Sequence, residues 1–266
     1  MIEGPADQTR GVEAARSSPL EKARTEDLLR IIPRGRRSVL DIGARDGHFS
    51  CLLTQYFAEV TALDLEPPAW RFPGVTTVAG DVTHLAFPDA AFDCVFCTEV
   101  LEHIAGLELA CREIVRVARR EIVIGVPFQQ DIRLGRTTCL ACGKTNPPWG
   151  HINSFTEQRL FSCFPALSVV SRSFVGLHKQ ATNAISARLM DWAGNPWGSY
   201  GQEEPCIHCG AILTPPPQRS AGSRLCSAAA ACLNRAQSAF TRPLPVWIHV
   251  LFSLPDRSAP LAAYRP

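Results

Sequence analysis

The chain has 266 residues, of which 46% are apolar and 20% are charged, and its formal net charge is +2. This composition is typical of a globular protein that is long enough for one large domain and a small additional module. The small net charge argues against a nucleic-acid partner, and no apolar stretch of about 18 residues is present that could cross a membrane.

Residues 1–18 are polar, contain Pro and Gly, and are predicted to form a flexible leader. They lack the basic start and the apolar core of a signal peptide, so we expect a cytoplasmic protein without membrane insertion.

Strand-like and helix-like segments alternate along most of the remaining chain. The predicted helices cover residues 20–32, 48–57, 99–104, 107–118 and 155–164. The predicted strands cover residues 38–42, 59–64, 76–79, 92–97, 121–125, 167–175 and 246–252. This alternation predicts an α/β domain over residues 19–180 with a doubly wound, mostly parallel sheet. The apolar segment within residues 244–255 is expected to close the sheet as its seventh strand.

Two stretches interrupt this pattern. Residues 130–150 and residues 194–243 are rich in Pro, Gly and Cys. We interpret the first as an inserted loop and the second as a small Cys-rich module.

A glycine-containing turn follows the first predicted strand, in the segment Asp41-Ile-Gly43-Ala-Arg-Asp-Gly47. Gly43 allows a tight turn and close approach to a ligand, and Gly47 eases packing at the start of the next helix. Asp64 ends the second strand, where a carboxylate can accept hydrogen bonds from ribose hydroxyls. Asp81 follows the third strand, where it can contact an adenine amino group.

This order of residues resembles the class I S-adenosylmethionine-dependent methyltransferases of type 11, over about residues 20–175. The resemblance implies a Rossmann-like methyltransferase fold and implies contacts to S-adenosylmethionine from Asp41, Gly43, Gly47, Asp64, Asp81, Val82 and Glu99. A nicotinamide dehydrogenase would also have an acid after the second strand, but would not predict Gly80-Asp81 or Phe92-Asp93. Arg45 replaces the middle glycine of the Gly-x-Gly-x-Gly pattern, which leaves the local loop shape open.

The sequence Glu99-Val-Leu-Glu102-His103 follows the fourth strand. On a helix these three polar residues would share one face, at the sheet edge where doubly wound folds bind ligands. One interpretation is that Glu99 helps to hold the cofactor and that His103 makes a local hydrogen bond.

The other interpretation is a divalent-metal site for Mg²⁺ or Mn²⁺, formed by Glu99, Glu102, His103 and His151. The element resembles one in ubiquinone-biosynthesis O-methyltransferases and small-RNA 2′-O-methyltransferases, which have a later histidine. A metal would lower the pKa of an acceptor hydroxyl. Without a metal, His103 or His151 is the candidate catalytic proton acceptor.

The sequence Asn146-Pro-Pro-Trp149 is similar to an element of amino-methyltransferases that act on nucleic-acid bases. In those enzymes the element follows the fourth strand, whereas here it follows the fifth. We therefore interpret it as a proline-stiffened loop.

Two Cys-x-x-Cys-Gly sequences have the form of zinc knuckles, Cys139 to Gly143 and Cys206 to Gly210. The simplest assignment is one structural zinc ion held by Cys206, Cys209, Cys226 and Cys232. The alternative joins Cys139 and Cys142 to Cys206 and Cys209. The spacing alone leaves both assignments open.

The sequence thus predicts a methyltransferase that methylates a hydroxyl of a small molecule, sugar or glycan intermediate. One alternative is an RNA methyltransferase that holds its substrate with a zinc ribbon. Another is a non-catalytic S-adenosylmethionine-binding protein that recruits a partner through its zinc module. The sequence predicts no oligomeric state.

Overall fold

The structure is a computed structural model that describes residues 18–179, 181–202 and 204–255. The predicted leader therefore lies outside the described residues, apart from Ser18. The helices are α2 Pro19–Ile31, α3 His48–Leu53, α4 Leu107–Val117, α5 Glu157–Ser162, α6 Ala184–Trp192 and α7 Ala221–Ser238, with 3₁₀ turns at Leu101–His103 and Pro148–Gly150. The strands are β1 Ser38–Ile42, β2 Glu59–Asp64, β3 Val75–Ala79, β4 Phe92–Thr98, β5 Ala118–Pro127, β6 Thr137–Thr138, β7 Thr145–Asn146, β8 Ser168–Val175 and β9 Trp247–Ser253.

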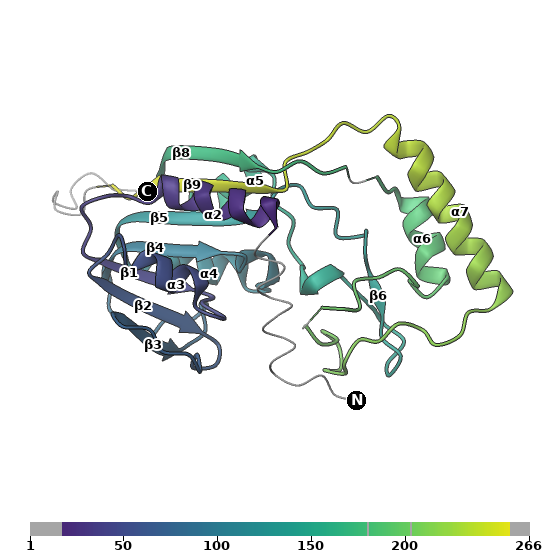
Figure 1. The fold of residues 1–266 in the computed structure, drawn as a ribbon, viewed down its shortest axis with the longest axis horizontal. Coiled ribbons are helices and arrows are strands. Elements are labelled where there is room, and N and C mark those ends of the chain that lie inside the picture. Colours follow the sequence, from purple (N-terminus) through teal and green to yellow (C-terminus); the bar gives the residue numbers. More distant parts are fainter. Residues whose placement is uncertain (1–17, 180, 203, 256–266) are drawn as a thin grey trace.

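Seven of these strands form one sheet in the order β3-β2-β1-β4-β5-β9-β8 (Figure 1). Strands β1 to β5 are parallel, and β9 runs antiparallel to both of its neighbours, β5 and β8. This confirms the predicted seven-stranded, mostly parallel sheet. The expected strand within residues 244–255 is present as β9, but it lies inside the sheet, and β8 forms the edge.

Helices cover both faces of the sheet, because its central strands are apolar on both sides. Every residue of β4 is buried. Successive side chains of this strand point to opposite faces, so Phe96 packs in the cluster that contains Leu28 of α2. Its neighbour Val95 packs in the other cluster, with Ile114 of α4.

Helix α2 lies over β8 and β9 and is fixed there by a buried polar contact. His249 of β9 is fully buried, and its Nδ1 lies 2.7 Å from Oδ2 of Asp27 in α2. The hydroxyl of Ser173 in β8 also donates to Asp27. The contact sets the position of α2 along the sheet, and Arg24 lies on the same helix.

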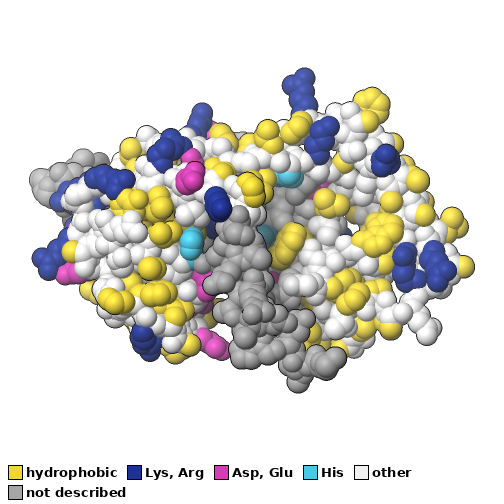
Figure 2. Space-filling model, in the orientation of Figure 1, with side chains coloured by type: hydrophobic (Ala, Val, Ile, Leu, Met, Phe, Trp, Pro, Cys, Tyr) yellow, Lys and Arg dark blue, Asp and Glu magenta, His cyan; other side chains and the backbone are white. Residues whose placement is uncertain are grey.

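Residues 176–246 leave the sheet between β8 and β9 and contain α6 and α7, which stand apart from the sheet in Figure 1. Hydrogen bonds link α7 to the residues that flank α6, from Gln237 Nε2 to the Thr182 carbonyl and from Ser223 Oγ to the Ala193 carbonyl. Hydrophobic side chains are exposed over this part of the molecule in Figure 2. In the described residues, no helix combines the length and the apolar composition needed to span a bilayer.

Candidate active site

The turn after β1 has three residues with left-handed backbone, at alternate positions. The φ angles are +78° at Gly43, +41° at Arg45 and +77° at Gly47. A Cβ atom at Gly43 would lie 2.3 Å from Val100 Cγ2, and one at Gly47 would lie 2.6 Å from the Trp70 ring. Glycine is therefore needed at both ends of the turn for space as well as for conformation. Arg45 adopts the left-handed conformation that the family's middle glycine would adopt without strain.

Asp64, at the end of β2, accepts two backbone hydrogen bonds, one of them from this turn. The Arg45 N–H donates to Asp64 Oδ2 at 2.7 Å, and the Leu65 N–H donates to Asp64 Oδ1 at 2.8 Å. Each carboxylate oxygen has a second lone pair, so Asp64 can still accept from the hydroxyls of a ligand.

Asp81 and Val82 follow β3 at the same edge of the sheet. The Gly80 N–H donates to the Asp64 carbonyl at 2.8 Å, which places the turn beside Asp64. Asp81 is exposed and accepts from the Thr83 N–H and hydroxyl, and Val82 is buried.

A cavity of about 690 Å³ opens beyond the carboxyl ends of β1 and β4. This volume lies within the range of small-molecule sites. Its wall includes five of the residues predicted for the cofactor or metal site, namely Asp41, Gly43, Glu99, His103 and His151. Five others of that set lie outside the wall, namely Gly47, Asp64, Asp81, Val82 and Glu102.

Asp41 contributes a buried acid to this wall. Its carboxylate accepts a hydrogen bond from the Ser50 hydroxyl. Burial raises the pKa of Asp41 to about 7, against the lowering effect of that hydrogen bond. A cationic ligand group beside Asp41 would favour the ionised carboxylate.

The predicted helix over residues 99–104 is wrong. Only Leu101–His103 is helical, as a 3₁₀ turn, and Glu99 has a φ of +56° at the end of β4. The chain turns sharply there, so Glu99 does not share a helix face with Glu102 and His103. The structure separates the predicted four-residue metal set into Glu99 and a group of three.

Glu99 lies near Arg24 of α2. The Arg24 guanidinium lies 5.6 Å from the Phe49 ring centroid and 5.3 Å from the Trp247 ring centroid. Burial raises the pKa of Glu99, against the lowering effects of the Arg24 charge and a hydrogen bond from Trp247. Its Oε1 is buried without a hydrogen-bond partner among the described residues.

Glu102, His103 and His151 form the group of three, and their ligand atoms all lie within 4.8 Å of one another. Asn153 holds the two segments together, because its Nδ2 donates to the carbonyls of Leu101 and Ile104 at 3.0 and 2.8 Å. Neither carboxyl oxygen of the buried Glu102 has a hydrogen-bond partner within the described part of the chain. Burial raises the pKa of Glu102 well above its usual value.

The two imidazoles of this group pack edge to face, with ring centroids 4.6 Å apart. Burial lowers the pKa of both His103 and His151 to about 4. Both rings are therefore neutral near pH 7. His151 Nδ1 lies 2.6 Å from Gln130 Oε1.

Several cavity residues were not among the predicted site residues. They come from α2, the loops after β5 and β7, the segment between α6 and α7, and β9, and include Arg24, Gln130, Trp149, Glu204 and Trp247. Trp149 ends the Asn146-Pro-Pro-Trp149 segment, which was predicted to be a loop. In the structure Asn146 lies in β7, and Pro148 and Trp149 lie in a 3₁₀ turn. Only tertiary contacts bring these residues to one cavity, so periodicity and motif spacing could not reveal them.

The structure brings the two Cys-x-x-Cys pairs together, which is the second of the two groupings that the spacing left open. Cys139, Cys142, Cys206 and Cys209 lie together, whereas Cys226 and Cys232 lie within α7. Six residues along an α-helix correspond to a rotation of about 240° and a rise of about 9 Å. Cys226 and Cys232 therefore project from different sides of α7, which corrects the assignment that grouped them with Cys206 and Cys209.

Comparison with known proteins agrees with this architecture. Residues 40–123 match the family described as methyltransferase domain. A probable S-adenosylmethionine-dependent methyltransferase of Mycobacterium tuberculosis is 29% identical over 187 residues, which cover 63% of this chain and 66% of that protein. A malonyl-acyl-carrier protein O-methyltransferase of Serratia marcescens is 34% identical over 86 residues, which cover 30% of this chain and 34% of that protein.

Among solved structures, the complex between a Haloferax volcanii Trm112 methyltransferase activator and a putative methyltransferase contains a similar fold. The TM-score is 0.52 at 12% identity, with 96% of this chain and 100% of that chain covered. The chain spans slightly less than two thirds of the length of the Mycobacterium tuberculosis relative and about one third of the Serratia marcescens relative. The matched segment contains the last three residues of β1, all of β2 to β4, most of β5 and the turn with Gly43 and Gly47. The chain therefore contains a class I S-adenosylmethionine-dependent methyltransferase domain.

Proposed function

We propose that this chain catalyses methyl transfer from S-adenosylmethionine to a hydroxyl group of a small molecule, sugar or glycan intermediate. One observation carries the proposal. A single cavity has Asp41 and Gly43 in its wall together with the neutral imidazoles of His103 and His151.

The residues around the β1 turn fit S-adenosylmethionine. Gly43 has no room for a Cβ atom, so the backbone itself forms the wall at that point. Asp41 offers a carboxylate to the cationic methionine end, and Asp64 has lone pairs available for ribose hydroxyls. Glu99, in the cavity wall, has a buried oxygen for which the described part of the chain provides no hydrogen-bond partner. When bound, S-adenosylmethionine supplies a methyl group already activated by its sulfonium.

The protein must then orient the acceptor and take its proton. Alignment of the reacting groups supplies up to about 7–11 kcal/mol of such a barrier. His151 is the better candidate for the proton acceptor. The Gln130 carboxamide oxygen accepts from Nδ1, so Nδ1 carries the proton and Nε2 presents its lone pair.

Labelled S-adenosylmethionine and fractionated cell extract test this proposal, since the fraction that gains label contains the acceptor. His151→Gln is expected to keep S-adenosylmethionine binding and to lower label transfer by about 10²- to 10⁴-fold. His84→Gln is the matched control, because His84 is exposed and lies outside the cavity wall. Transfer by His151→Gln at the rate of the control would contradict the assigned role.

Divalent-metal assistance is a second candidate, favoured by the two carboxyl oxygens of Glu102, which have no hydrogen-bond partner among the residues that the structure describes. With Glu99 outside the group, two imidazoles and one carboxylate remain, which suits Mn²⁺ better than Mg²⁺. A cation there would lower the pKa of an acceptor hydroxyl. Activity lost in EDTA and restored by Mn²⁺ would support this form, and EDTA-insensitive transfer would leave His151 as the proton acceptor.

The same labelling experiment separates the alternatives. Lys and Arg side chains are scattered over the face shown in Figure 2, rather than gathered in one patch. This distribution favours a small acceptor over RNA. Label in an RNA fraction would favour the RNA methyltransferase, and cofactor binding without label in any fraction would favour the non-catalytic binding protein.

A further inference from the structure

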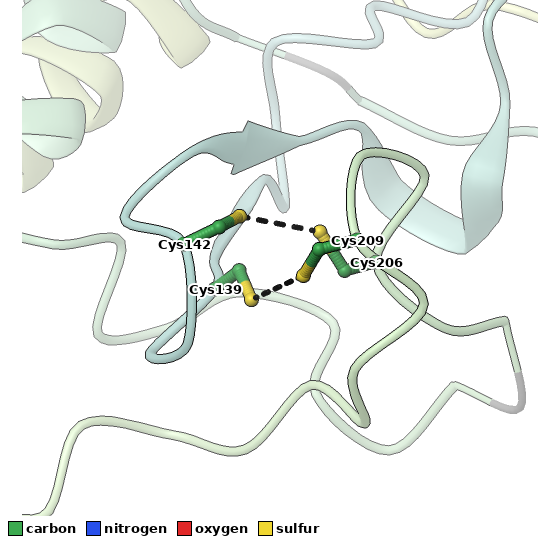
Figure 3. A group of neighbouring side chains, drawn as sticks. All are labelled: Cys139, Cys142, Cys206 and Cys209. Atoms are coloured by element: carbon green, nitrogen blue, oxygen red, sulfur yellow. Dashed lines mark hydrogen bonds between the residues drawn. The ribbon is translucent and has the colours of Figure 1, made fainter.

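Four cysteines outside the cavity converge from two segments that lie about 60 residues apart in the sequence (Figure 3). Cys139 Sγ lies 3.7 Å from Cys209 Sγ, and Cys142 Sγ lies 3.7 Å from Cys206 Sγ. All four sulfur atoms lie within 4.8 Å of one another. The sulfur pairs are too far apart for disulfides, in which the S–S distance is about 2.05 Å.

The two segments have the same local geometry. Gly143 N–H donates to the Cys139 carbonyl and Gly210 N–H to the Cys206 carbonyl, both at 2.8 Å. The glycine φ angles are both +72°. Each loop also has a closing bond at 2.9 Å, from Cys139 N–H to the Lys144 carbonyl and from Cys206 N–H to the Ala211 carbonyl. Each pair of cysteines thus lies on a tight loop that presents both sulfur atoms on one side.

The spacing of the sulfur atoms fits a tetrahedral zinc ion. With Zn–S bonds of about 2.3 Å, the edges of an ideal tetrahedron of sulfur atoms are about 3.8 Å long. The two cross-loop distances of 3.7 Å match this edge. Four thiolates are the donor set of closed structural zinc sites, and each thiol releases its proton when it binds the metal.

The surroundings provide little hydrophobic stabilisation. The buried apolar cluster at this place contains Cys139, Cys206 and Leu213, with Tyr200 and Ala211 packed against it. Two of its three buried members are themselves candidate zinc ligands. A metal ion is the usual means of ordering a segment with so small a core.

Polar contacts connect the cysteine cluster to the cavity. Asn146 Oδ1 accepts from the Ile207 N–H at 3.0 Å, and this bond joins the two loops. Beyond it, Gln202 Oε1 accepts from the Trp149 N–H at 2.7 Å. Trp149 and Glu204 both line the cavity, and Glu204 lies two residues before Cys206.

We propose that Cys139, Cys142, Cys206 and Cys209 hold one structural zinc ion that fastens these two loops together. The zinc ion thereby fixes Trp149 and Glu204 in the cavity wall. Asp41 and Gly43 belong to the sheet and its first turn, so cofactor binding is independent of this zinc ion.

The test uses the full chain purified without added chelator and dialysed into metal-free buffer, with zinc measured by mass spectrometry. One zinc ion per chain is expected. Cys142→Ser and Cys209→Ser alter ligands that are exposed, and each is expected to lose the bound zinc. Cys226→Ser and Cys232→Ser are matched controls on α7 and are expected to keep it.

Two further measurements keep the outcome clear. Each zinc-free variant should bind S-adenosylmethionine within about twofold of the parent protein, which shows that the sheet is folded. Proteolysis of the same variants should cleave within residues 137–149 or 204–213 at least tenfold faster than in the controls. Neither measurement requires methyl transfer, so the zinc site is tested independently of the proposed function.

Zinc lost from the α7 variants but kept by Cys142→Ser would overturn the proposal in favour of the other cysteine grouping. A parent protein that takes up neither Zn²⁺ nor Co²⁺ in reducing buffer would overturn the metal site itself. Unchanged proteolysis in the zinc-free variants would overturn the fastening of the two loops.

Discussion

Replacing Gly43 with alanine tests the interpretation of the β1 turn most directly. Two separate costs are expected, because Gly43 has a φ of +78° and a Cβ atom there would lie 2.3 Å from Val100 Cγ2. Gly74 provides a matched control. Its φ is +80°, but a Cβ atom there would meet only Thr54 Cγ2, at 3.9 Å.

The magnitudes follow from these contacts. The left-handed conformation costs a residue with a side chain about 1–2 kcal/mol, and the stiffer unfolded chain returns about 0.4–1 kcal/mol. Gly74→Ala should therefore lower the free energy of unfolding by about 1 kcal/mol. Gly43→Ala has the same strain and an added steric overlap of about 1–3 kcal/mol. We expect a total loss of about 2–4 kcal/mol.

Urea unfolding of both variants measures this difference, and the double variant Gly43→Ala with Val100→Ala identifies its source. In the Val100→Ala background, the cost of Gly43→Ala should fall to about 1 kcal/mol, because the overlapping methyl group is gone. The coupling energy should be about 1–3 kcal/mol. Equal losses at Gly43 and Gly74, or no coupling to Val100, would refute the steric argument.

Three further predictions concern aspartates. Asp64→Ala should weaken S-adenosylmethionine binding by about 10- to 100-fold in calorimetry, since hydrogen bonds to a charged group contribute about 1.5–3 kcal/mol; an unchanged Kd would exclude contact with Asp64. Burial raises the pKa of Asp41 to about 7, and a cationic ligand favours its ionised form. The affinity for S-adenosylmethionine should therefore rise as the pH increases through 7, and binding below pH 7 should release a proton. Asp41→Asn should remove this dependence, and a persistent slope would assign it to another group. Burial by itself would raise the pKa of Asp93. Hydrogen bonds from the Arg37 and Ser38 N–H groups outweigh this effect and lower the pKa below its usual value. Its contribution to stability is therefore present above about pH 4, near the unfolded pKa, and is lost as the pH falls further. Thermal unfolding of Asp93→Asn should show a shallower loss of Tm on acidification than the parent protein, and equal slopes would contradict this.

The fold was largely predictable because its signals are local. The apolar strand over residues 92–97 and the alternation of strands and helices both follow from short-range patterns, and β4 is fully buried as that pattern requires. The position of β9 was not predictable. An apolar segment near residue 250 indicates a strand, but only its pairing with β5 on one side and with β8 on the other places it inside the sheet.

The site was predictable only in part, because some of its signals are local and others depend on how distant segments pack. Gly43 and Gly47 have the left-handed backbone that their motif implies. Glu99 was placed on a helix because helical spacing fits its sequence, whereas its φ of +56° ends the strand in a sharp turn instead. The grouping of Cys139 with Cys209 depends on how two distant loops pack, which Cys-x-x-Cys spacing alone does not determine.

The interior position of β9 has a consequence for folding. Strands β5 and β8 are both synthesised before the roughly 70 residues that precede β9. Until β9 is made, β5 is paired only with β4, and β8 has no partner in the sheet. Closing a loop of that length costs about 2–3 kcal/mol more than closing a four-residue hairpin. During synthesis on the ribosome, β5 therefore exposes an unpaired apolar edge, which is the condition under which nascent sheets aggregate.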